Sequence, residues 1–228
     1  KYAALCIVCL CSSLFFLGLY HFDNKYSQNT IQAANGILAL SENDLKKSPV
    51  RFLVSGWEFY PDALLTPEEI QDSDHYMRYL SIGEMSNFSS PAAPSTYGCG
   101  TYRMTFFLPE RKEAYAIELP EVFSSYTLYL DHDRILQLGD PEQRIPLVQN
   151  RMVTFYGGKP VTLTIAVSNY DHFYGGIVYP PAFGTMLAVN TSRGIRFAFC
   201  LFSCTVTFVC ALLSFYFSHR MKQKNAFL

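Results

Sequence analysis

The fold of this chain is decided by two runs, residues 98–108, which read GCGTYRMTFFL, and residues 161–169, which read VTLTIAVSN. In the first run Tyr102, Met104 and Phe106 alternate with smaller or polar residues, and the second run alternates in the same way. A period of two is typical of a strand that is buried on one face. Both runs are therefore predicted to be β-strands.

Further apolar alternations follow at residues 115–119 and 126–130. Turn-forming residues separate the runs, as in DHD at 131–133 and GGKP at 157–160. Short strands at this spacing predict a mainly β fold, a jelly-roll β-sandwich, with a last strand from Phe183 to Val189. Short helical turns are predicted where Ser41 can cap against Asp44 and where Pro67 follows Thr66.

Two uncharged apolar stretches lie on either side of the predicted sandwich. Tyr2 to Phe22 and Phe197 to Phe217 contain no Asp, Glu, Lys or Arg. A helix of about 20 apolar residues can cross a bilayer, so residues 1–22 and 195–218 are predicted to be transmembrane helices. A cleaved signal peptide is the alternative for the first stretch, but no small-x-small motif follows Phe22, which favours an uncleaved anchor.

Basic residues predict the orientation of these helices. Lys1 precedes the first stretch, and Arg220, Lys222 and Lys224 follow the second. Because positive flanks remain in the cytoplasm, the protein is predicted to be a multi-pass cell-membrane protein with residues 23–194 extracellular. Residues 219–228 are predicted to be a cytoplasmic loop that leads to a further span, so the chain is expected to be part of a longer protein.

The predicted exterior domain is acidic and cannot form its own disulfide. It holds 19 acidic and 13 basic residues, a net charge of −6, which disfavours nucleic acid as a partner. Six of the seven cysteines lie in the apolar stretches, and Cys99 alone lies in residues 23–194. This cysteine usage fits a bacterial exterior domain that is stabilised by its core.

An ordered set of short motifs in this domain resembles a known family. The motifs are ANGIL at 34–38, SGWEFY at 55–60, GTYR at 100–103, LPEV at 119–122, VSN at 167–169, His172 and the glycine pair at 175–176. This set resembles the extracellular jelly-roll domain of bacterial seven-transmembrane receptors with diverse intracellular signalling modules, including membrane sensor histidine kinases. It is also similar to the galactose-binding-like sugar-binding domain of β-galactosidase-type glycoside hydrolases.

The resemblance implies a function as well as a fold. In the sensor family, the exterior domain signals through its membrane helices to a cytoplasmic output module, such as a histidine kinase or a diguanylate cyclase. No such module is visible in this chain.

The best ligand candidates lie in the loop NYDHFY at residues 169–174. Aromatic faces stack on sugar rings, and the amide of Asn169, the imidazole of His172 and the phenol of Tyr174 can bind hydroxyl groups. A purely structural role is the alternative, because an Asn at a strand end often caps the backbone.

Trp57 and Arg103 are further candidates. Trp57 can serve as a stacking platform or belong to the core. Arg103 can bind a carboxylate or sugar hydroxyl, or it can pair with an acid such as Glu118. Asp131 and Asp133 at a tight turn suggest calcium as the one cofactor to consider, although turns favour the same residues.

The sequence lacks the common motifs of catalysis. The sequence has no Gly-x-Ser-x-Gly elbow, no His-Glu-x-x-His pair and no phosphate-binding glycine loop. The leading hypothesis is therefore a sensor input region that binds an unknown extracellular ligand, with carbohydrate as the class considered. The alternatives are a membrane-anchored carbohydrate-binding module and a structural or assembly subunit that binds another exterior protein domain. The expected partners are the lipid bilayer and either a second copy or another membrane protein.

Overall fold

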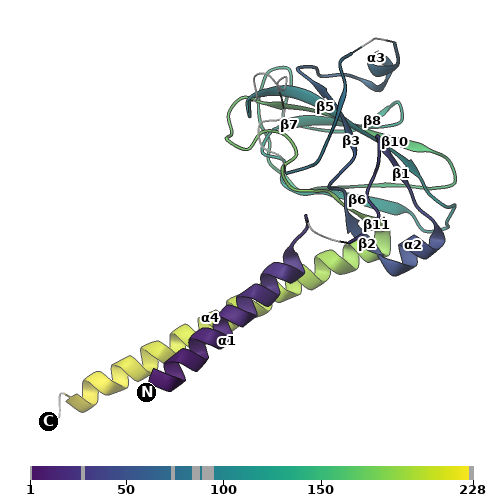
Figure 1. Cartoon of the computed structure of the whole chain (residues 1–228). Helices are drawn as coiled ribbons and strands as arrows, with labels where there is room; N and C mark the ends of the chain where they lie inside the picture. The colour runs from purple at the N-terminus through teal and green to yellow at the C-terminus, as the bar shows by residue number, and fades with distance from the viewer. Residues whose placement is uncertain (1, 27–28, 73–74, 84–87, 89–94, 226–228) are drawn as a thin grey trace.

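The computed structural model of the chain describes residues 2–26, 29–72, 75–83, 88 and 95–225. In these residues eleven strands form two sheets, and two long helices extend from one end of the sandwich (Figure 1). The prediction of a mainly β fold is confirmed.

The larger sheet has the strand order β4-β3-β5-β10-β7-β8, with β1 paired to β5. Its strands are β1 (Ile37–Ala39), β3 (Trp57–Pro61), β4 (Arg78–Leu80), β5 (Gly98–Phe107), β7 (Ser125–Leu130), β8 (Asp133–Leu138) and β10 (Val161–Asn169). The smaller sheet has the order β2-β11-β6-β9, with β2 (Val50–Phe52), β6 (Tyr115–Leu119), β9 (Arg151–Phe155) and β11 (Ala182–Thr185). The pairing of β1 with β5 is parallel and the other pairings of these strands are antiparallel.

The alternating sequences form the centre of the core, as their period requires. β10 pairs with β5 from Val161 opposite Phe106 to Asn169 opposite Gly98. The buried Phe106 ring lies 5.6 Å from that of Phe155 and 5.2 Å from that of Phe183, centroid to centroid. Because the last two residues belong to the smaller sheet, these contacts join the two sheets. Complete burial of one such side chain stabilises the fold by about 1.5–3 kcal/mol.

Two short helices confirm the capping predictions. α2 (Glu42–Lys47) begins after Ser41, whose side chain accepts from the Asp44 backbone while the Asp44 carboxylate accepts from the Ser41 N–H. α3 (Pro67–Asp72) begins after Thr66, which exchanges the same pair of hydrogen bonds with Glu69. Both ends satisfy backbone donors that have no partner within the helix.

The long helices are α1 (Tyr2–Asp23) and α4 (Met186–Asn225). The predicted strand from Phe183 to Val189 is wrong beyond Thr185, because the backbone turns into α4 at Met186. The Thr185 hydroxyl accepts from the Ala188 N–H at 3.3 Å and caps the helix. Val189 is buried although it is helical, which explains why its apolar character mimicked a strand. The predicted boundary between residues 194 and 195 therefore lies inside one continuous helix.

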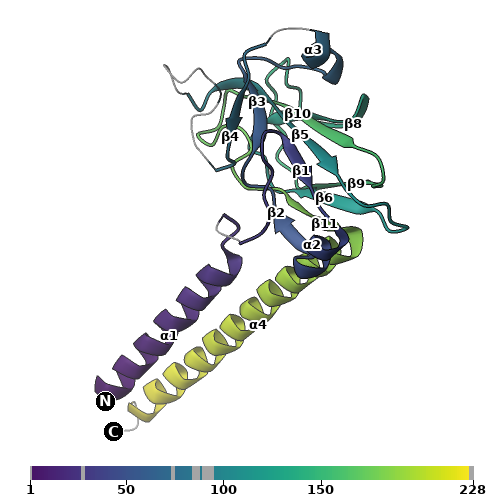
Figure 2. The same ribbon diagram turned by 45° about the vertical axis from the view of Figure 1, so that its right-hand side comes forward.

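The far end of α4 also differs from the prediction. Residues 219–225 are helical, not a loop, and residues 226–228 lie outside the described residues. Both termini of the chain lie at the end of the helices that is distant from the sandwich (Figures 1 and 2).

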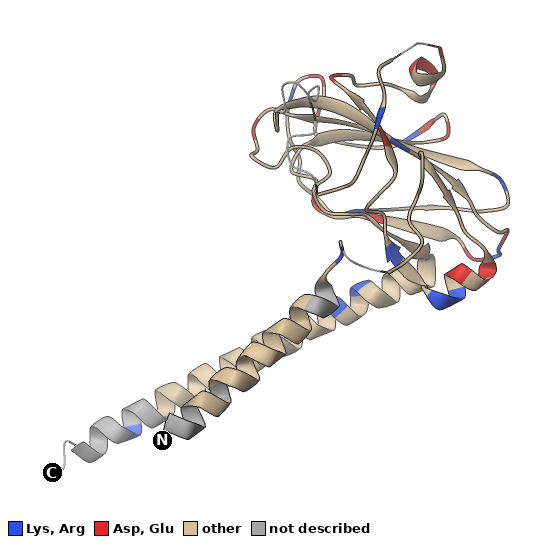
Figure 3. Ribbon diagram, viewed as in Figure 1, with Lys and Arg blue, Asp and Glu red and all other residues tan. Residues whose placement is uncertain are grey.

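The two long helices are largely uncharged. Figure 3 shows few charged residues along them, whereas both signs of charge are spread over the sandwich. Among the described residues one helical stretch, Met186–Tyr216, is long and apolar enough to cross a bilayer, and α1 contributes the shorter apolar stretch Cys9–Tyr20. One long helix could thus span a membrane, and the second span stays a prediction.

Candidate functional site

Four ring side chains of the loop between β10 and β11 form a group with Phe123. We define the aromatic cluster as Phe123, His172, Phe173, Tyr174 and Tyr179. The rings of Phe123 and His172 stack with centroids 4.6 Å apart and planes 12° apart, and His172 stacks on Tyr174 at 5.6 Å. Phe173 is 63% exposed and Tyr174 is 38% exposed, so the cluster offers aromatic surface to solvent.

The buried side chain of Asn169 holds this loop in place through hydrogen bonds. Its side chain is buried, and its Nδ2 donates to the carbonyl oxygens of Thr96 at 2.8 Å and His172 at 2.7 Å. Its Oδ1 accepts from the His172 N–H at 3.2 Å. The amide is therefore engaged on both sides, and Asn169 positions the loop; it does not offer its amide to a ligand.

His172 has one ring nitrogen engaged by the loop itself. Nδ1 accepts from the Tyr174 N–H at 3.1 Å, which places the proton of the neutral ring on Nε2. The donor thus belongs to a ring that stacks on the partly exposed Tyr174. Aromatic faces with an adjacent polar group suit a ligand that has both a flat apolar side and hydroxyl groups.

Two glycines allow the loop to lie close to its neighbours. A Cβ on Gly175 would lie 1.9 Å from the Thr96 carbonyl oxygen, so a side chain would have to displace backbone. Gly176 has a φ of +79°, in the left-handed region that L side chains rarely adopt. The glycine pair therefore keeps the aromatic cluster at its place on the sandwich.

The structure removes Trp57 from the ligand candidates. Its side chain is fully buried, its indole N–H donates to the Leu53 carbonyl at 3.0 Å, and its ring meets Tyr102 edge-on. A stacking platform needs an exposed ring face, so the core alternative is correct.

Arg103 is held by a different acid from the one suggested by the sequence. Its Nη1 lies 3.2 Å from Glu58 Oε2 on the neighbouring strand β3, whereas Glu118 contacts Asn150 and Arg193. The Arg103 side chain is 27% exposed, so this ion pair is part of the outer face of the larger sheet. Burial raises the pKa of Tyr60, and the nearby Glu58 carboxylate raises it further.

At the turn suggested for calcium, the side chains bind other groups of the protein. Asp131 has a φ of +53°, and its Oδ1 accepts from the Thr162 N–H at 2.8 Å. His132 Nδ1 lies 2.8 Å from Glu68 Oε1 of α3. Among the described residues, no three His, Cys, Asp or Glu side chains gather where they could hold a metal ion.

Sequence reasoning missed Phe123 and Tyr179, which contact each other and connect the aromatic cluster to Lys25, just after α1. Tyr179 meets Phe123 edge-on at 6.2 Å, and the Lys25 amine lies 6.0 Å from the Tyr179 ring centroid. The Tyr26 hydroxyl donates to the Val178 carbonyl at 2.8 Å. The abundance of aromatic residues near the glycine pair was a signal for Tyr179, but the contact of Phe123 depends on tertiary packing.

Comparison with known proteins identifies no family. No family model matches the chain, and no curated protein matches it. Similar solved structures include a glycosyl hydrolase family 2 member from Bacteroides cellulosilyticus, with a TM-score of 0.47, 12% identity and coverage of 60% of this chain and 20% of that one. They also include β-glucuronidase 3 from Bacteroides uniformis, with a TM-score of 0.46, 11% identity and coverage of 61% and 22%.

A β-galacturonidase of glycosyl hydrolase family 2 from Eisenbergiella tayi, in a structure bound to galacturonate, has a TM-score of 0.42 and 14% identity. The match covers 59% of this chain and 24% of that one. The chain thus spans less than a quarter of the length of these enzymes.

Proposed function

We propose that this chain is the input region of a membrane sensor, in which the aromatic cluster binds an extracellular ligand and the helices carry the response. The observation that supports this proposal most is the continuity of the chain. The loop that holds the cluster leads into β11, and β11 continues into α4 at Met186 without a linker.

The first turns of α4 are attached to the smaller sheet by several contacts. The Met186 N–H donates to the Ala114 carbonyl at 2.9 Å, and the Leu187 N–H donates to Glu113 Oε1 at 2.9 Å. Further along the helix, Arg193 Nε lies 3.7 Å from Glu118 Oε1. A shift of β11 would therefore move the start of α4 with it, as expected of rigid-body coupling.

The aromatic cluster also reaches α1. Tyr179 belongs to the cluster and contacts Lys25, which follows α1 closely in the chain. The cluster is thus connected to the ends of both helices, to α1 through Lys25 and to α4 through β11. A ligand that favours one arrangement of the cluster can therefore affect both helices. Such a ligand shifts the population of the helix arrangements only by its difference in affinity for them.

The topology proposed with this function has α1 and α4 both crossing the bilayer and the sandwich outside. The basic residues beyond the two outer ends support this orientation. The ordered sequence motifs that resemble bacterial seven-transmembrane receptors point the same way.

A carbohydrate is the ligand class that suits the cluster. Phe173 and Tyr174 are exposed and are not part of the core, and Tyr174 stacks on the ring of His172. To test this, the full chain in lipid nanodiscs is applied to a glycan array. We expect His172→Ala and Tyr174→Ala each to weaken binding to a captured glycan about tenfold or more, a loss of about 1.4 kcal/mol.

Tyr156→Ala is the matched control, because Tyr156 is an exposed tyrosine just after β9. The glycan affinity of this variant should stay within about twofold of that of the unchanged chain, because Tyr156 lies outside the cluster. Unchanged affinity in both cluster variants would show that the site is elsewhere.

Hydrogen exchange separates the sensor from a simple anchored module. With the captured glycan bound, we expect slower exchange in residues 177–190, which include β11 and the start of α4. Protection limited to residues 170–176 would support the anchored carbohydrate-binding module instead. A full array without any captured glycan would favour a subunit that binds another protein.

A further inference from the structure

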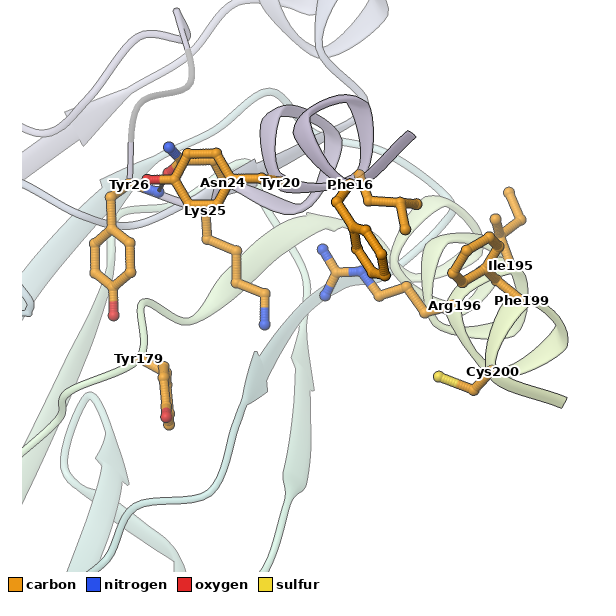
Figure 4. A pocket seen from close by; sticks show the side chains of 11 residues that line it. Phe16, Tyr20, Asn24, Lys25, Tyr26, Tyr179, Ile195, Arg196, Phe199 and Cys200 are labelled. Carbon is orange, nitrogen blue, oxygen red and sulfur yellow. Dashed lines mark hydrogen bonds between the residues drawn. The ribbon is translucent and has the colours of Figure 1, made fainter. Parts of the chain in front are cut away.

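A cavity lies where α1, α4 and the sandwich meet. It has a volume of about 980 Å³, and the two helices supply apolar walls that include Phe16, Leu19 and Phe199 (Figure 4). Phe16 and Phe199 belong to the uncharged stretches of the two helices. Two of the large apolar side chains that line the cavity are exposed, Phe16 at 67% and Ile195 at 56%. The cavity is therefore accessible from outside the protein, and its walls suit a hydrocarbon chain.

The same cavity reaches the aromatic cluster. Tyr179 belongs to the cluster and also lines the cavity, at the end that lies opposite Phe199 and Cys200 (Figure 4). The Tyr179 ring lies 6.2 Å from that of Phe123, and the Phe123 ring lies 6.0 Å from that of Tyr174, centroid to centroid. The aromatic surface and the apolar cavity are thus neighbours that share one side chain.

The contacts of the cluster with the end of α1 indicate its depth relative to a bilayer. Lys25 and Tyr26 come shortly after the uncharged stretch Tyr2 to Phe22. The Lys25 amine lies 6.0 Å from the Tyr179 ring centroid, and the Tyr26 hydroxyl donates to the Val178 carbonyl at 2.8 Å. In the two-span topology of the proposed function, on which this inference rests, Lys25 and Tyr26 lie at headgroup depth. The aromatic cluster then lies close to the lipid headgroups, and the cavity leads from it toward the hydrocarbon layer.

We infer that the ligand of the aromatic cluster is a glycolipid, whose sugar binds at the cluster and whose hydrocarbon chain lies in the cavity. A free sugar uses only the rings of the cluster, whereas a sugar linked to a lipid occupies both neighbouring sites with one molecule. Tyr179 lies where the sugar joins the hydrocarbon chain. A ligand bound in this way contacts both helices directly, because α1 and α4 form the walls of the cavity.

Native mass spectrometry of the full chain in mild detergent tests whether both parts of such a ligand are needed. The probes are monoglucosyl and monogalactosyl diacylglycerol. They are compared with diacylglycerol of the same acyl chains and with the methyl glycosides of the two sugars. We expect at least one of the two glycolipids to be retained about tenfold or more above either part alone, because the two parts bind as one molecule.

Two variants separate the sugar end of the site from the hydrocarbon end. Tyr174→Ala should lower the retention of the glycolipid about fivefold or more and leave that of diacylglycerol unchanged, because it removes aromatic surface at the sugar end alone. Cys200→Phe adds bulk to the wall of the cavity. It should lower the retention of the glycolipid and of diacylglycerol about fivefold or more, because less hydrocarbon can be buried.

Each variant has a matched control. Tyr156→Ala removes an exposed tyrosine outside the cluster. Cys210→Phe makes the same change as Cys200→Phe on the same helix, at an exposed position that is not among the described residues lining the cavity. Both controls should retain the glycolipid within about twofold of the unchanged chain. Fluorescence of Trp57, the only tryptophan of the chain and buried in the sandwich, verifies that each variant is folded.

Glycolipids retained no better than diacylglycerol, or glycolipid retention that Tyr174→Ala or Cys200→Phe leaves unchanged, would overturn the inference. The glycan array distinguishes this failure from that of the proposed function. A chain that captures a free glycan on the array but retains neither glycolipid refutes the lipid-linked ligand alone. A chain that binds no sugar in either experiment refutes both the glycolipid and the proposed carbohydrate site.

Discussion

At the scale of single residues, buried polar side chains hold the irregular parts of the sandwich in place. Arg51 is buried and donates to the carbonyl oxygens of Asp44 at 3.0 Å and Ser48 at 3.1 Å. It thereby satisfies carbonyls near the C-terminal end of α2, and burial lowers the pKa of its guanidinium. Asn169 does the same for the loop of the aromatic cluster.

Replacing Asn169 tests the support of that loop. Asn169→Ala removes three hydrogen bonds of a buried amide and leaves backbone groups of Thr96 and His172 unpaired. We expect a loss of about 1–3 kcal/mol in the free energy of unfolding, measured by urea titration with Trp57 fluorescence. Asn150→Ala, which removes a single 3.3 Å bond to Glu118, should cost less. Equal costs for the two variants would contradict the role given to Asn169.

The ion pair between Arg111 and Glu42 predicts a pH dependence. The hydrogen bond from Arg111 lowers the pKa of the Glu42 carboxyl. Its stabilising effect is therefore present above the ordinary glutamate value of about 4.3 and is lost as pH falls through the lowered pKa.

Arg111→Gln should lower the thermal unfolding midpoint at neutral pH but leave it unchanged below the folded pKa of Glu42, where the carboxyl is neutral. Lys112→Gln is the control, because Lys112 is the exposed neighbour of Arg111. A difference between Arg111→Gln and the unchanged chain that persists in acid would mean that Arg111 acts through packing.

At the scale of elements, the junction of β11 and α4 determines how the sandwich is joined to its helices. β11 pairs with β2 and with β6, so it is hydrogen-bonded on both sides up to the point where the helix begins. Thr185 is both the last residue of β11 and the cap of α4. This double role leaves no residue to act as a flexible linker.

Thr185→Val tests this junction, because valine retains the branched shape suited to a strand but has no hydroxyl. We expect a loss of about 1 kcal/mol and faster amide exchange at Ala188, whose N–H loses its acceptor. Thr191→Val, at an exposed position within α4, is the matched control. If exchange at Ala188 is unchanged, Thr185 is not the cap that holds the helix start.

At the scale of the whole molecule, the sandwich sits at one end of a pair of helices and both termini at the other (Figure 2). Alkaline phosphatase is active only outside the cytoplasm, and green fluorescent protein can report the opposite location. We predict that phosphatase fused after Tyr26 is active and phosphatase fused after Asn225 is inactive, whereas a fluorescent fusion after Asn225 is bright. Active phosphatase after Asn225 would reverse the proposed orientation.

Local pattern was enough for the features that depend on neighbours in the chain. Alternation predicted β5 and β10, capping chemistry predicted α2 and α3, and uncharged length predicted the apolar helices, because each depends on residues a few positions apart. The same reasoning failed at residues 186–189, where one buried apolar face fits a strand or a helix. Only the capping contacts of Thr185 and the packing of Val189 decide between them.

The candidate site depended more on tertiary structure than the fold did. The order of residues along the chain already places aromatic and polar residues before the glycine pair, whereas packing between distant segments sets which of them face solvent. It buried Trp57, engaged Asn169 in the loop, paired Arg103 with Glu58 and brought Phe123 onto His172. Those outcomes follow from contacts between residues distant in sequence, which a one-dimensional pattern does not contain.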